Sequence, residues 1–168
     1  MRLGGGVAAR RAEEIADLPV RLALGGTMLY HGLSKLRGEG PAQTSQMFES
    51  LGLTPGRPLA IATGVTEALA GAAAILGIGT RAAALAVLAT QAVAIWKVHG
   101  PKGYSNMQGG MEYNLSIAAM SLGLLLTHPG VLSLHRAATR GRARARGVPG
   151  WLTRAQPGFA DRALAVMH

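Results

Sequence analysis

The sequence predicts an all-α fold, namely an integral membrane four-helix bundle with both termini in the cytoplasm. Of its 168 residues, 49% are hydrophobic and only 15% are charged, whereas about a quarter of the residues in a soluble domain are charged. Four apolar stretches approach the length of about 20 residues that an α-helix needs to cross a bilayer. A chain of this length forms one domain with a real core and is too short for two.

The first predicted span covers residues 18–36, with Asp17 as its expected N-cap and Pro19 in its first turn. A signal peptide is the alternative interpretation of this segment. Against it, the preceding flank contains acidic as well as basic residues, and Arg21 lies where an apolar core would begin. We therefore expect a retained helix.

The other three spans are more apolar. They are predicted at residues 58–78, at residues 80–98 after the tight G-I-G turn, and at residues 111–127. Glycine is frequent in these segments, which predicts close contacts between helices. The connection at residues 41–51 carries Met47 and Phe48 at helical spacing, so we expect a helix along the outer interface.

Basic residues predict the orientation. If both termini lie on one side, that side carries 12 of the 17 Lys and Arg residues and the other side carries 5, so the termini are expected in the cytoplasm. The chain then divides into a cytoplasmic segment (1–17), a membrane domain (18–134) and a basic cytoplasmic tail (135–168). The tail's R-G-R-A-R-A-R stretch is expected to bind anionic lipid, at about 1 kcal/mol per basic residue, and not nucleic acid.

Glu67 is the clearest candidate for chemistry. It lies near the middle of the second span, on a face made of small residues, and an acid within a membrane is costly unless it is paired or hydrated. Lys35 and His31 lie at the end of the first span from which the second span enters, so they are the nearest cations. Glu67, Lys35 and His31 are therefore the catalytic candidates, in a pocket that exchanges protons or binds a ligand. A purely structural ion pair, or a Lys35 that reaches the interface, remains open.

The connection before the fourth span adds polar groups at the same side of the membrane. With Tyr113 beside them in the first turn of the fourth span, we expect one rim above Glu67 to collect His31, Lys35, His99, Lys102, Glu112 and Asn114. Helix-dipole stabilisation of Glu112 and an aromatic belt that includes Tyr113 are the alternatives. The five histidines show no metal-binding spacing, so no metal is expected. The absence of cysteine excludes thiol chemistry by this chain.

The chain resembles the DoxX family of small bacterial four-helix membrane proteins. The resemblance rests on R-L-A-L-G-G-T-M-L-Y-H-G-L-S-K-L in the first span, on G-V-T-E-A-L-A-G-A-A-A-I-L-G-I-G-T-R-A-A-A through the next two, and on the M-E-Y-N that opens the fourth. It covers about residues 18–134. The family's polar positions fall on Arg21, His31, Lys35, Glu67, Glu112 and Asn114.

The resemblance implies a redox-associated subunit of the bacterial inner (plasma) membrane, linked to a quinone or to oxidative stress. A subunit of an oxidoreductase complex is expected rather than a stand-alone enzyme. Lys35 and His31 would bind a quinone-like carbonyl, and Glu67 or Glu112 would exchange protons. The residues expected to contact a cofactor are Arg21, His99, Glu112, Tyr113 and Asn114.

Two other functions fit the sequence. One is a small carrier or flippase for an anionic solute, which would require a homo-oligomer because the chain is short. The other is a structural anchor that recruits soluble enzymes through its basic tail.

Overall fold

The computed structural model describes residues 15–127, and every regular element in that range is helical. The α-helices are α2 (Leu18–Leu36), α3 (Gly40–Ser50), α4 (Gly56–Leu76), α5 (Thr80–Val93) and α6 (Glu112–Leu126). A π-helix, η1 (Ala94–His99), and two short 3₁₀ turns, η2 (Gly100–Lys102) and η3 (Asn106–Gln108), join α5 to α6. The predicted N-terminal segment, up to residue 14, and the arginine-rich tail lie outside the described residues.

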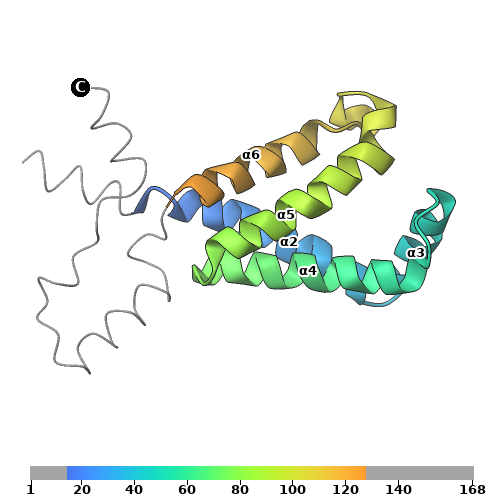
Figure 1. Ribbon diagram of the computed structural model, residues 1–168, viewed down its shortest axis with the longest axis horizontal. Helices are drawn as coiled ribbons and strands as arrows, with labels where there is room; N and C mark the ends of the chain where they lie inside the picture. Colours follow the sequence, from blue (N-terminus) through green and yellow to red (C-terminus); the bar gives the residue numbers. More distant parts are fainter. Residues whose placement is uncertain (1–14, 128–168) are drawn as a thin grey trace, which may run out of the picture.

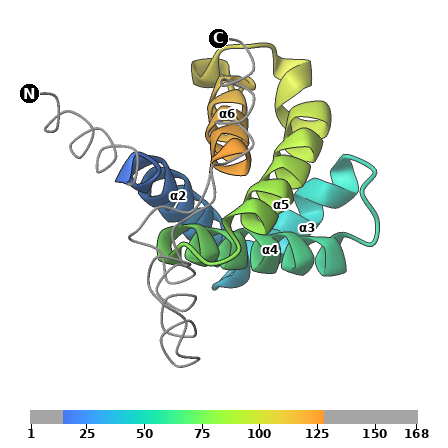
Figure 2. The same cartoon turned by 60° about the vertical axis from the view of Figure 1, so that its left-hand side comes forward.

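The four longer α-helices form two antiparallel pairs. Helices α2 and α4 lie side by side, and α6 packs on α5. The two pairs converge at the α4–α5 turn and diverge toward the opposite end, where α3 and the η1–η3 connection are found (Figures 1 and 2). Each long helix thus runs antiparallel to the neighbour it packs against.

Large apolar side chains are exposed on the outside of the protein, and several polar side chains are buried beside its apolar core. Large apolar side chains on the outer faces of α4, α5 and α6 are exposed, among them Leu69, Leu85 and Leu126. The buried positions include Arg21, Glu67, Thr80, Gln91, Asn114 and Ser121. Such an exterior matches a hydrocarbon environment, in which polar groups must be satisfied inside the protein.

Two helices in the described part of the chain are long and apolar enough to cross a membrane, namely α4 and the continuous helical stretch Thr80–Lys102. Helix α6 is apolar but shorter, at 15 residues. Helix α2 has 19 residues and contains Arg21 and Lys35. These findings support membrane-type helices, whereas the count of four spans stays a prediction.

Glycines bring α2 and α4 into backbone contact. A Cβ atom added to Gly32 would collide with the backbone nitrogen of Ala68, and one added to Gly25 would lie 2.8 Å from the carbonyl oxygen of Gly71. A Cβ atom on Gly71 would in turn collide with the backbone nitrogen of Leu29. The prediction that small residues mediate helix contact is confirmed at this seam, which we call the glycine seam.

Helix boundaries agree closely with the predicted spans, and the differences have physical causes. The structure confirms the α3 helix, on which Thr44 and Phe48 are buried. Gly77 and Gly79 adopt left-handed conformations (φ 68° and 57°), which is what makes the G-I-G turn tight.

One local prediction was wrong and another was right only in part. The helix that begins at Thr80 continues to Lys102, beyond the predicted end at residue 98, because η1 and η2 extend it. Asp17 occupies the N-cap position as predicted, but it makes no side-chain capping hydrogen bond; its carboxylate lies 3.5 Å from a guanidinium nitrogen of Arg21.

Replacing Gly32 by alanine is expected to push α2 and α4 apart and to destabilise the protein by about 1–3 kcal/mol, as overpacking does elsewhere. The matched control is Gly26→Ala on the same helix, where an added Cβ atom meets nothing within 4 Å. Thermal unfolding of the two variants in the same detergent checks this. Equal melting temperatures for the two variants would contradict close packing at the glycine seam.

Candidate functional site

Lys35 and Glu67 form an ion pair across the α2–α4 interface. The Lys35 ammonium lies 2.6 Å from Glu67 Oε2, and the two side chains are 20% and 7% exposed respectively. Glu67 projects from the small-residue face of α4, beside the glycine seam, so no bulky side chain keeps the lysine away. The sequence prediction that Lys35 supplies the cation for Glu67 is confirmed.

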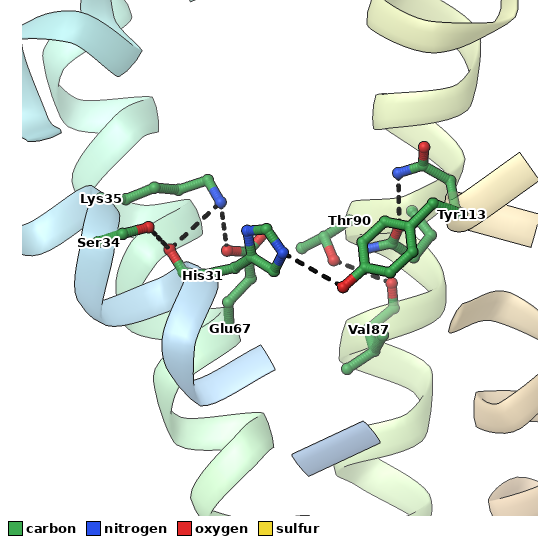
Figure 3. A network of polar contacts seen from close by, with 9 residues as sticks. His31, Ser34, Lys35, Glu67, Val87, Thr90 and Tyr113 are labelled. Carbon is green, nitrogen blue, oxygen red and sulfur yellow. Dashed lines mark hydrogen bonds and ion pairs between the residues drawn. The ribbon is translucent and has the colours of Figure 1, made fainter. Parts of the chain in front are cut away.

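His31 extends this pair toward the second helix pair. The Lys35 ammonium also lies 3.4 Å from the backbone carbonyl oxygen of His31. His31 Nε2 lies 3.4 Å from the hydroxyl oxygen of Tyr113, in the first turn of α6. Figure 3 shows the imidazole between Glu67 on one side and Tyr113 on the other. We call His31, Lys35, Glu67 and Tyr113 the polar cluster.

The polar cluster runs from a buried group to an exposed one. Glu67 is 6% exposed and Tyr113 is 40% exposed, while His31 is half-buried between them. The cluster therefore links the α2–α4 seam to the surface where the two helix pairs diverge. Lys35, at 20% exposed, also gives the ion pair partial access to the surroundings.

A second buried polar contact joins α5 and α6. The side-chain amide of Asn114 donates to Gln91 Oε1 at 2.8 Å, and both residues are at least nine-tenths buried. The remaining oxygen of Asn114 is buried and has no hydrogen-bond partner, which costs roughly 1–3 kcal/mol. The π-helix η1 begins three residues after Gln91, and such helices are often retained near functional sites.

Sequence reasoning missed Gln91, because it is uncharged and lies in the apolar run L-A-T-Q-A-V. The signal that reveals it is a long amide side chain inside a membrane-type helix, which needs a partner on another helix. Asn114, one helical step after Tyr113, supplies that partner.

Arg21 forms hydrogen bonds with α4 at the opposite end of α2. It is fully buried, and its guanidinium donates to the carbonyl oxygens of Ala74 and Ile75, each at 2.9 Å, in the last turn of α4. The last carbonyls of an α-helix lack the usual i+4 partner, and here the Ala74 carbonyl accepts the N–H of the C-cap Gly77 at 3.2 Å in addition to the Arg21 guanidinium. Fourteen residues, or about 21 Å of helix, separate Arg21 from Lys35, so the structure does not bring it to the polar cluster. Its cofactor-binding role stays a prediction.

His99 and Glu112 hold the connection between α5 and α6. His99 Nδ1 lies 2.7 Å from the carbonyl oxygen of Gly109, and Glu112 Oε2 accepts the backbone N–H of Asn106 at 3.1 Å. Lys102 is exposed in the same connection. Within residues 15–127, no hydrogen bond or ion pair joins these three residues to Glu67, so their contact with a cofactor stays a prediction.

Residues 15–127 contain no preformed metal site. Across the described residues there is no group of three or more His, Asp or Glu side chains that could hold a metal ion. The polar cluster offers a different chemistry, with an ammonium group, an imidazole and a phenol as donors and one buried carboxylate as acceptor.

Comparison with known proteins identifies a family. The model of the DoxX family matches residues 16–100, half of the chain, and this range contains α2 to η1 with three of the four members of the polar cluster. No curated protein matches the chain, and no solved structure does either.

Removing one partner of the Lys35–Glu67 pair is expected to cost about 3–5 kcal/mol, because the other charge remains buried and unpaired. The double variant Lys35→Met/Glu67→Gln removes both charges and is expected to unfold close to the wild type. Reversible unfolding in bicelles of the two single variants and the double variant measures this coupling. The control is Glu39→Gln, at an exposed acid. Strictly additive losses would show that the two groups do not interact.

Proposed function

The chain belongs to the DoxX family of membrane proteins, and from that premise we propose that it is a redox-associated subunit of the bacterial inner membrane whose polar cluster binds a membrane quinone. The observation that carries this proposal is the buried 2.6 Å ion pair linked through His31 to the exposed Tyr113. Intramembrane charges are costly and usually mark a functional site. A purely structural pair would not need the connection to the surface.

The donor set fits a quinone. Quinone carbonyls accept hydrogen bonds, and Lys35, His31 and Tyr113 all carry donors. A bound quinone would supply two-electron, two-proton redox chemistry. Glu67 can hold and release a proton beside that ligand. Glu112, the other predicted acid, is exposed and accepts a loop N–H group, so Glu67 is the better candidate.

Electrons have to come from another component. The chain has no cysteine, so it supplies no thiol and no cysteine-ligated iron–sulfur cluster. We therefore propose that a partner oxidoreductase delivers the electrons and that this chain holds the quinone and its protons. This agrees with a subunit rather than a stand-alone enzyme.

A four-span topology with both termini in the cytoplasm belongs to the same proposal. It places α3 and the η1–η3 connection on the outer side. Within residues 15–127, the outer end carries five basic residues, namely Lys35, Arg37, Arg57, Lys97 and Lys102. The cytoplasmic end carries two in the same range, Arg21 and Arg81. The orientation therefore depends on the many arginines before residue 15 and after residue 127.

Lys35→Ala is expected to lower binding of a short-chain benzoquinone by roughly tenfold, since a charge-assisted hydrogen bond contributes about 1.5–3 kcal/mol. The measurement is native mass spectrometry of the full chain in detergent, titrated with decyl-substituted benzoquinone. Tyr113→Phe removes only an exposed hydroxyl, so it tests binding without unfolding the ion pair. It is expected to weaken binding in the same direction.

The control for these variants is Lys102→Ala, at an exposed lysine outside the polar cluster. It is expected to bind the benzoquinone as the wild type does. Absence of binding to the wild type, or equal binding by all four proteins, would refute the quinone proposal.

A further inference from the structure

An open hollow of about 370 Å³ lies between α3 and the first turn of α4. Helix α3, which contributes much of its lining, lies at the end of the described chain away from the α4–α5 turn (Figure 1). Its lining consists of small, polar and basic residues from three consecutive segments, namely Gly38, Pro41, Ala42, Ser45, Gln46 and Arg57. Neither the polar cluster nor the proposed quinone chemistry uses these residues.

The hollow lies where the membrane surface is expected. Arg57 is in the first turn of α4, one of the helices long and apolar enough to cross a membrane. Helix α3 buries Thr44 and Phe48 and leaves Met47 39% exposed, as an interfacial helix does. The start of a spanning helix and an interfacial helix both lie at the depth of lipid headgroups.

Arg57 provides the positive charge among the residues that line this hollow, and it forms no ion pair with the Glu49 carboxylate, which accepts a hydrogen bond from the lining Ser45. The ion pairs in the described part of the chain are Lys35–Glu67 and Arg21–Asp17, so neither includes Arg57. A cation in the first turn also faces the positive end of the helix dipole, which is unfavourable. An anion in the hollow would relieve both effects.

The side chains that line the hollow fit a phosphate group. A guanidinium binds phosphate through two parallel N–H···O hydrogen bonds. Gln46, which is exposed, can add an amide donor. The Ser45 hydroxyl donates to Glu49 Oε1 at 3.3 Å, so it is not counted as a donor, and Pro41 and Ala42 offer an apolar wall. The volume exceeds that of a phosphate group and leaves room for the glycerol attached to it.

We propose that this hollow binds the phosphate headgroup of an anionic phospholipid, with Arg57 as the principal ligand and Gln46 as the second donor. The site fixes α3 and the start of α4 at the membrane surface. It is independent of the quinone proposal, because it shares no residue with the polar cluster.

The test is native mass spectrometry of the full chain in detergent, titrated with phosphatidylglycerol and with phosphatidylcholine of the same acyl chains. The wild type is expected to prefer phosphatidylglycerol. Arg57→Gln is expected to lower phosphatidylglycerol affinity about fivefold, which corresponds to about 1 kcal/mol for one basic residue near a lipid surface. Gln46→Glu adds a carboxylate to the hollow and is expected to lower it as well, with no cation removed.

Arg37→Gln is the matched control, because Arg37 is exposed at the same end and does not line the hollow. This control measures how much affinity is lost when any basic residue at this end is neutralised. Lipid that binds elsewhere on the chain is expected to be unaffected by either substitution. Equal losses for Arg57→Gln and Arg37→Gln, or no loss for Arg57→Gln, would overturn the proposal. Binding of inorganic phosphate that requires Arg57, without a preference for phosphatidylglycerol, would also overturn it and would indicate a soluble anion.

Discussion

The ion pair between Lys35 and Glu67 is the interaction on which the arrangement of the other elements depends. A carboxylate buried among small residues requires a cation within about 3 Å, because the cost of removing it from water is otherwise several kcal/mol. The cation comes from the neighbouring helix, so α2 must approach α4 closely. Gly25 and Gly32 on one helix and Gly71 on the other permit that approach, since a Cβ atom at any of them would meet the opposite backbone. The ion pair therefore depends on the close approach of the two helices at the glycine seam.

The second helix pair completes the polar interior that begins at this ion pair. His31 contacts Tyr113 of α6, and Asn114, the next residue, is held by Gln91 of α5. Each of the four long helices thus contributes a polar side chain to contacts between helices, while large apolar side chains such as Leu69, Leu85 and Leu126 are exposed on the outside. Burying those leucines between helices would yield no hydrophobic free energy, because the surrounding lipid tails are equally apolar. The bundle is therefore stabilised by close packing and by these polar contacts. At the other end, Arg21 satisfies the last carbonyls of α4.

Sequence patterns predicted what depends on length, charge and small residues. Apolar length predicted the bounds of α2, and the pairing of Lys35 with Glu67 followed from their positions in the same half of the membrane on two neighbouring helices. The patterns failed where contacts between particular side chains decide. Asp17 occupies the N-cap position, but its carboxylate lies against Arg21, four residues along the same helix, and makes no capping hydrogen bond. Gln91 carries no charge and becomes visible only when α6 places Asn114 against it. The η1 extension of α5 has no local signal, because its residues are ordinary helix formers.

The measurement that tests this account most directly is the distance between the Lys35 ammonium and the Glu67 carboxylate in a lipid bilayer. The chain has three lysines and six glutamates, so solid-state NMR with ¹⁵N-labelled lysine and ¹³C-labelled glutamate resolves the contact with few competing signals. Lys97 lies over the ring of Trp96, 4.2 Å from its centre, and serves as an internal reference because it has no carboxylate partner within residues 15–127. Strong nitrogen–carbon dephasing that disappears in Glu67→Gln is the predicted result, in keeping with a 2.6 Å contact. A Lys35 signal that shows no dephasing by any glutamate in the bilayer would contradict the buried ion pair and the site built around it.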